Sequence, residues 1–244
     1  MSARKSRKNK PQRLIEGETQ AQYAHRVIEE MIVTLALPPG SRISEQYLSD
    51  QLGIGRTPVR EALQRLAYER TIQILPRSGA VVSPIDISEQ FKLIEVRREL
   101  ERIMVTRAAR LIDPVARRKF LDLEERFRRA EETDDASIFI PADREFNLLL
   151  ARTADNDYAA AAMAPLQAQT RRLWFLYFKH FGDVSRVAGL HADIARAIAD
   201  KDEQRARAAS DALVDYAEDY TYRTIEAVQN ETAKEESGAT RQVA

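Results

Sequence analysis

The sequence predicts a mainly α-helical protein, in which an N-terminal winged helix-turn-helix domain is joined to a C-terminal antiparallel bundle of about six helices. Between residues 17 and 85, three helical segments separated by tight turns precede two short β-rich runs. Between residues 86 and 229, apolar side chains recur at helical spacing and the connections are short, which is typical of a bundle. The polar segments 1–16 and 230–244 are expected to be disordered.

The first two helices follow from apolar spacing and from the residues that end helices. Apolar side chains occupy one helical face from about Thr19 to Leu37. Two prolines and a glycine at 38–40 then stop that helix, since proline cannot continue it and glycine permits a turn. Ser44 suits the N-cap of a second, short helix, and Gly53 suits the left-handed residue that ends it.

A third helix is predicted from the segment GRTPVREALQRL at 55–66. Thr57 suits its N-cap and Pro58 its first position, where the missing N–H of proline has no intrahelical partner anyway. The apolar residues recur at helical spacing and form one buried face: Val59, Leu63 and Leu66. Arg56 and Arg60 therefore lie at the exposed, electropositive N-terminal end, which favours binding of an anion.

Two β-rich runs follow the third helix and flank the turn sequence PRSG, which predicts a hairpin over residues 71–82. A hairpin directly after a helix-turn-helix is a wing. Its tip would bring one cation, Arg77, and one position without a side chain, Gly79, toward DNA.

The charge is balanced overall but divided unevenly along the chain. The 38 basic and 38 acidic residues of the whole chain split into 13 and 8 up to Pro84, a net charge of +5, and 25 and 30 after it, a net charge of −5. A basic first third indicates a nucleic-acid-binding module attached to a regulatory or oligomerising body. The cationic arm at 1–13 is expected to be a solvated tail; the alternative is an arm that follows DNA.

Composition also argues against several classes of protein. The chain has no cysteine and three histidines, and it contains no nucleophile elbow or phosphate-binding glycine loop, so we expect no enzyme activity and no cofactor. No apolar run is long enough to span a bilayer, and no apolar signal core follows the basic N-terminus. These features predict a cytoplasmic protein without membrane contact.

The chain resembles the GntR family of bacterial transcription regulators, in its FadR-like branch with an all-helical FCD-type effector domain. The resemblance runs from about Thr19 to Val228 and is most specific in PPGSRISEQYLSDQLGIGRTPVREALQRL and ILPRSGAVV. It implies DNA contacts at six residues: Gln46, Arg56, Thr57, Arg60, Arg77 and Gly79. For Arg56 and Arg60 the chemistry agrees, because the planar guanidinium matches the O6 and N7 acceptors of guanine.

The resemblance also implies a cavity in the helical domain, where many relatives bind a divalent metal through one aspartate and three histidines. Asp143 and His191 match two of these ligands, whereas Asn147 and Leu213 stand at the other two positions. An amide oxygen is a poor replacement for imidazole and leucine cannot coordinate a metal, so we expect no tightly bound transition metal. His191 is then a core histidine hydrogen-bonded to Asp143 or Asn147.

The same cavity is expected to bind an effector through Arg97, Asp143, Asn147 and His191. Arg97 matches an arginine that faces the cavity in many relatives and can hold a carboxylate with two hydrogen bonds. Its neighbours Arg98 and Glu101 are candidates for surface ion-pair partners. A stripe on a later helix, consisting of Arg171, Trp174 and Tyr177, is expected to belong to the core.

Together these features predict a dimeric regulator that binds a short inverted-repeat operator in double-stranded DNA. We expect a repressor that is released by a small organic acid. The alternatives are a metal-dependent regulator of the same family and a helical scaffold whose winged motif binds protein.

Overall fold

A computed structural model describes the backbone of residues 14, 17–76, 79–181 and 183–242, and the side chains of these residues except 178–181 and 231–242. The chain divides between Ile85 and Asp86 into two compact units. Residues 1–13 of the basic arm and Arg77 of the expected wing tip lie outside the described residues.

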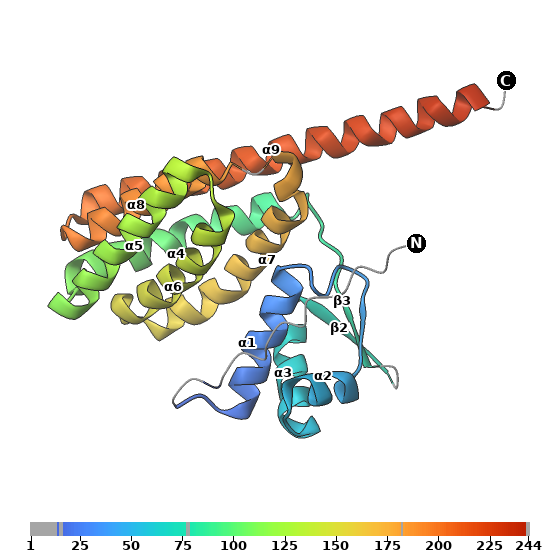
Figure 1. Ribbon diagram of the computed structural model, residues 1–244, viewed down its shortest axis with the longest axis horizontal. Helices are drawn as coiled ribbons and strands as arrows, with labels where there is room; N and C mark the ends of the chain where they lie inside the picture. Colours follow the sequence, from blue (N-terminus) through green and yellow to red (C-terminus); the bar gives the residue numbers. More distant parts are fainter. Residues whose placement is uncertain (1–13, 15–16, 77–78, 182, 243–244) are drawn as a thin grey trace. The chain divides into compact units, whose positions relative to one another are not determined.

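The first unit contains three helices and three short strands (Figure 1). In chain order these are α1 (Gln20–Val33), β1 (Arg42–Ile43), α2 (Glu45–Leu52), α3 (Arg56–Tyr68), β2 (Ile72–Leu75) and β3 (Gly79–Val82). Helices α1 and α3 pack against each other, and the buried side chains of α2 and the sheet join the same core. The winged helix-turn-helix prediction is confirmed.

Local sequence signals placed both ends of α2 correctly, whereas α1 ends at Val33 rather than near Leu37, and the start of α3 also differs from expectation. Ser44 caps α2 by accepting a hydrogen bond from the backbone N–H of Tyr47, and Gly53 ends that helix in the left-handed conformation with a φ of 65°. The expected cap of α3 at Thr57 is wrong: the helix begins at Arg56, after Gly55, and it has no side-chain cap. Any N–H in the first turn lacks an intrahelical partner, so proline is tolerated beyond the first position and did not fix the start.

The three strands form an antiparallel sheet in the order β1-β3-β2. The hairpin of β2 and β3 is the predicted one, with Leu75 paired to Gly79. Strand β1 was not predicted, because two residues are too few to show alternation. It matters for the wing nonetheless: a Cβ built on Gly79 would lie 2.4 Å from the carbonyl oxygen of Ile43 in β1.

The second unit contains six described helices, as the bundle prediction requires (Figure 1). They are α4 (Gln90–Leu111), α5 (Pro114–Thr133), α6 (Ala136–Ala154), α7 (Asp157–Phe181), α8 (Val184–Ala199) and α9 (Glu203–Gln242). Helix α8 contacts α4, α5, α6 and α9, and its many alanines permit this close approach. Among the described residues, none of the helices is both long and apolar enough to cross a membrane.

The second unit differs from expectation at its C-terminal end. At its start, Asp86 accepts hydrogen bonds from the backbone and the hydroxyl of Ser88, and α4 begins at Gln90 without a side-chain cap. Helix α9 continues to Gln242, so the expected disordered tail at 230–244 is helical over most of its length (Figure 1). The tail is rich in alanine and glutamate, which favour helix once a packed helix precedes them.

The close approach at Gly79 generates a stability prediction. Gly79→Ala is expected to destabilise the first unit by about 1–2 kcal/mol from its φ of 83°, and by about 1–3 kcal/mol more from the contact with Ile43. Urea unfolding followed by circular dichroism and by amide exchange within the first unit measures this change.

Gly40→Ala is the matched control, since its φ is 81° but nothing lies within 4 Å of the added Cβ. It shares the conformational cost and lacks the contact. Equal losses in the two variants would show that the sheet yields to the added methyl group.

Candidate DNA-binding surface and effector cavity

The first turns of α3 present a cationic surface. Val59 is buried in the core of the first unit, whereas Arg56, Thr57 and Arg60 are exposed. The unpaired N–H groups at this helix end add positive potential, so the surface attracts phosphate and the electronegative edge of guanine.

Arg60 is held by a carboxylate of the preceding helix. Its Nε donates to Oε1 of Glu45 over 2.9 Å, and its Nη2 donates to Oε2 over 2.8 Å. The side chain of Arg60 remains 62% exposed, and that of Glu45 is 29% exposed. The hydrogen bonds from Arg60 lower the pKa of Glu45, so the pair is charged at neutral pH.

Arg56 is held by a side-chain amide of α2. Its Nη2 donates to Oε1 of Gln46, and Nε2 of Gln46 donates in turn to Oδ1 of Asp50 over 2.7 Å. These two hydrogen bonds fix the orientation of the Gln46 amide, because its oxygen accepts from Arg56 and its nitrogen donates to Asp50. Helix α2 therefore orients Arg56 and Arg60 at the start of α3.

Gly79 and Arg77 are the other two residues expected to contact DNA. Gly79 begins β3, and its lack of a side chain is required by the protein's own backbone at Ile43. Arg77 lies outside the described residues. The structure thus brings Gln46, Arg56, Thr57 and Arg60 to one end of the helix-turn-helix.

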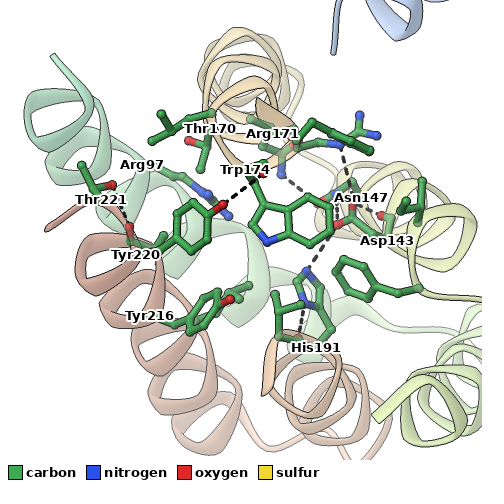
Figure 2. A pocket seen from close by; sticks show the side chains of 18 residues that line it. Arg97, Asp143, Asn147, Thr170, Arg171, Trp174, His191, Tyr216, Tyr220 and Thr221 are labelled. Carbon is green, nitrogen blue, oxygen red and sulfur yellow. Dashed lines mark hydrogen bonds and ion pairs between the residues drawn. The ribbon is translucent and has the colours of Figure 1, made fainter. Parts of the chain in front are cut away.

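A cavity of ≈ 80 Å³ lies in the second unit among α4, α6, α7, α8 and α9 (Figure 2). A single water needs roughly 10–15 Å³, so the cavity has room for several waters or a small ligand. It brings together all four residues expected to bind an effector: Arg97, Asp143, Asn147 and His191.

Asp143 of α6 is a buried carboxylate with three polar neighbours. Oδ1 lies 3.3 Å from Nε2 of His191 and accepts from Nδ2 of Asn147 over 2.9 Å, while Oδ2 lies 3.3 Å from Nε of Arg171 (Figure 2). Burial by itself raises the pKa of Asp143, but the hydrogen bond from His191 and the charges of Arg171 and Arg97 outweigh it and lower the pKa. Asp143 is therefore ionised in the interior.

His191 of α8 lies in an aromatic environment. Its ring centroid is 5.2–5.6 Å from those of three phenylalanines on α5 and α6: Phe127, Phe139 and Phe146. Its Nδ1 lies 2.8 Å from the carbonyl oxygen of Val187. A carbonyl can only accept, so Nδ1 donates to Val187, and Nε2 faces Asp143; the ring donates to both acceptors only when each nitrogen carries a proton.

The two positions that lack a metal ligand are filled in other ways. Asn147 uses its Nδ2 on Asp143 and accepts from Gln167 at its Oδ1, so both ends of its amide are engaged. Leu213 contributes an apolar side chain to the cavity wall. Within the described part of the chain, no group of three or more histidine, cysteine, aspartate or glutamate side chains is arranged to hold a metal ion.

Arg97 of α4 lines the cavity and pairs along its own helix. Its Nε donates to Oε1 of Glu101 over 2.6 Å, and Oε2 of Glu101 accepts from the hydroxyl of Ser210 over 3.1 Å. The candidate pair of Arg98 with Glu101 does not form, because Arg98 makes an ion pair with Asp215 of α9 over 2.7 Å. Of these two neighbours, Arg97 therefore lines the cavity and Arg98 links α4 to α9.

Sequence reasoning assigned Arg171 and Trp174 to the core, and the structure places both in the cavity wall. The indole of Trp174 lies across the middle of the cavity, with Tyr216 and Tyr220 on one side and His191 on the other (Figure 2). Tyr177 is absent from the lining. Spacing on α7 showed that the three side chains share a face, but only the packing of α7 shows which of them reach the cavity.

Comparisons with known proteins support a two-domain regulator. The family model described as "Bacterial regulatory proteins, gntR family" matches residues 20–82, and that described as "FCD domain" matches residues 92–216. The HTH-type transcriptional repressor RspR of Escherichia coli K12 is 29% identical over 184 residues, which cover 74% of this chain and 79% of that protein. The regulator McbR of the same organism is 30% identical over 139 residues, 57% and 60% of the two chains.

Solved structures share the fold. E. coli McbR superposes with a TM-score of 0.74 at 20% identity, covering 85% of this chain and 99% of that one. A GntR regulator from Rhodococcus sp. RHA1 superposes with a TM-score of 0.59 at 22% identity, covering 85% and 98%. Members of this family are DNA-binding regulators rather than enzymes, and FCD domains bind small-molecule effectors. The chain therefore belongs to the GntR family of transcription regulators, in the group that carries an FCD effector-binding domain.

Proposed function

We propose that this regulator is a cytoplasmic repressor that binds an inverted-repeat operator as a homodimer and is released by a small organic acid. The observation that carries the DNA-binding part is the pair Arg56 and Arg60, exposed at the N-terminal end of α3 and oriented by α2. One helix-turn-helix per chain reads one half-site, and a twofold dimer reads a twofold site. The relative RspR is named a transcriptional repressor, which supports repression rather than activation.

The dimer is supported by the outer face of α4. Val96 and Ile103 are seven residues apart on this helix, and they are 53% and 45% exposed. Apolar side chains two turns apart form a stripe that a second copy of the helix can cover.

Arg60→Ala is expected to weaken binding to the specific site by about 1–3 kcal/mol and to weaken binding to random DNA much less. The site is first selected from a library of random duplexes with the wild-type protein, and the affinities are then measured at fixed salt. Two chains per duplex are expected. Arg65→Ala, which removes an equal charge further along α3, is the control and should leave the preference for the site intact.

Equal losses on both sequences would reduce Arg60 to a phosphate contact. Absence of salt-dependent binding to any duplex would favour the protein-binding scaffold instead.

The effector part rests on the two cavity arginines. Arg97 uses Nε for Glu101, and among the described residues its two terminal nitrogens have no hydrogen-bond partner. Arg171 adds a second cation on the opposite side of Trp174 (Figure 2). Two guanidinium groups with aromatic walls suit a small carboxylate, since arginine binds carboxylate with paired hydrogen bonds.

A thermal-shift screen of small carboxylates and sugar acids tests this part. A binding acid at 100 times its Kd is expected to stabilise the wild type by about 2.7 kcal/mol and to reduce its affinity for the selected duplex, because the two binding sites are linked. Arg97→Ala and Arg171→Ala should each abolish both effects and preserve DNA binding without ligand. Arg98→Ala is the matched control, since Arg98 is next to Arg97 but outside the cavity wall. Stabilisation that survives in both cavity variants would exclude this mode of binding.

The metal-dependent alternative is tested by metal analysis. Protein purified without chelator is expected to contain no stoichiometric zinc, nickel or manganese, and EDTA should leave its melting temperature unchanged, since Asn147 and Leu213 cannot complete the ligand set. The double variant Asn147→His, Leu213→His restores the set of one aspartate and three histidines and should gain metal binding. About one metal per wild-type chain, lost in His191→Ala, would establish the metal-dependent regulator instead.

A further inference from the structure

We propose that Glu45 is a positioning residue for DNA recognition, which holds one edge of the Arg60 guanidinium so that the other edge is presented to a guanine. The inference rests on the proposed reading of DNA by Arg60 and adds a residue on a different helix, α2. It also predicts how an acidic side chain at a DNA-binding surface can increase sequence preference.

The hydrogen bonds of the pair leave the reading edge available. A guanidinium has five N–H donors, and Arg60 gives one from Nε and one from Nη2 to the two carboxylate oxygens of Glu45. Among the described residues, Nη1 has no partner. The edge formed by Nη1 and Nη2 therefore keeps two parallel N–H groups, which is the arrangement that matches O6 and N7 of guanine.

Glu45 is itself well placed to fix a long side chain. It is the first residue of α2, directly after the Ser44 cap, and its side chain is 29% exposed. Arg60 is 62% exposed, so without Glu45 its guanidinium would sample many rotamers in solvent. Holding it before DNA arrives removes part of the entropy lost on binding, and only the site with guanine in register gains from the fixed geometry.

The negative charge of Glu45 also increases the preference for the specific site, because it weakens binding to random DNA. A carboxylate close to the DNA-binding surface offsets one cation in the sequence-independent attraction to phosphates. Binding to random duplexes is thereby weakened, whereas the specific complex retains the oriented arginine. Both effects increase the ratio of specific to random affinity, which is the quantity to measure.

The test compares Glu45→Gln with Glu61→Gln on the duplex selected by the wild type and on a scrambled duplex of equal length. Glu61 is exposed on α3 and has no ion pair with a described residue, so its variant removes an equal charge from the same unit. Glu45→Gln is expected to lower the affinity ratio about two- to tenfold, the range expected for ordering one long side chain. Glu61→Gln should raise both affinities by a similar factor and leave the ratio unchanged.

Two further variants separate position from charge. Glu45→Asp retains the charge but is one methylene shorter, so it should also lower the ratio. In an Arg60→Ala background, Glu45→Gln should leave the ratio unchanged, because no guanidinium remains to be positioned.

The outcomes are distinguishable. If Glu45→Gln leaves the ratio of specific to random affinity unchanged or raises it, the inference is overturned. Glu45 would then only repel DNA or block the access of Arg60 to it. A ratio already unaffected by Arg60→Ala alone would overturn the proposed base reading, and this inference with it. Circular dichroism and the melting temperature check that each variant is folded.

Discussion

The interior of the effector domain depends on the buried carboxylate of Asp143. A buried charge costs several kcal/mol unless it is paired and hydrogen-bonded. Its partners come from separate helices: Asn147 is one turn further along α6, Arg171 is on α7 and His191 on α8. The helices around the cavity must therefore keep the positions that satisfy this group, and aromatic packing around His191 helps to hold it there.

Arg56, Arg60, Arg97 and Arg171 each already have an acidic or amide partner within the chain. Glu45 holds Arg60, Glu101 holds Arg97, and Asp143 lies beside Arg171. Pairing keeps a long cation oriented and lowers the entropy lost when a ligand binds. In the proposed function, an incoming carboxylate joins or replaces such a partner at the cavity arginines, and this exchange is a physical route by which an effector alters the arrangement of the helices.

Most of the fold could be predicted from the sequence because helix periodicity and turn residues are local signals. Ser44, Gly53 and the β-rich runs around the wing were placed correctly for that reason. The errors fall where local signals are weak or shared. Strand β1 is two residues long, Thr57 and Gly55 compete for one helix start, and the end of α9 depends on how far a packed helix propagates. Arg56, Thr57 and Arg60 could be selected as candidate DNA contacts because they lie within one short segment, and their contact with DNA stays a prediction.

The sequence by itself determined the class of this protein, since the PPG turn, the RTPVREAL helix and the following helical body occur in an order typical of one family. It also showed that Leu213 cannot coordinate a metal and that the amide of Asn147 is a poor replacement for imidazole, because these are properties of the side chains alone. Only the tertiary structure decided which residues meet. Glu45 and Arg60 are 15 positions apart, and Asp143 meets Arg171 and His191 from other helices. Such contacts depend on how helices pack, and periodicity along one helix carries no information about the side chain that a neighbouring helix presents.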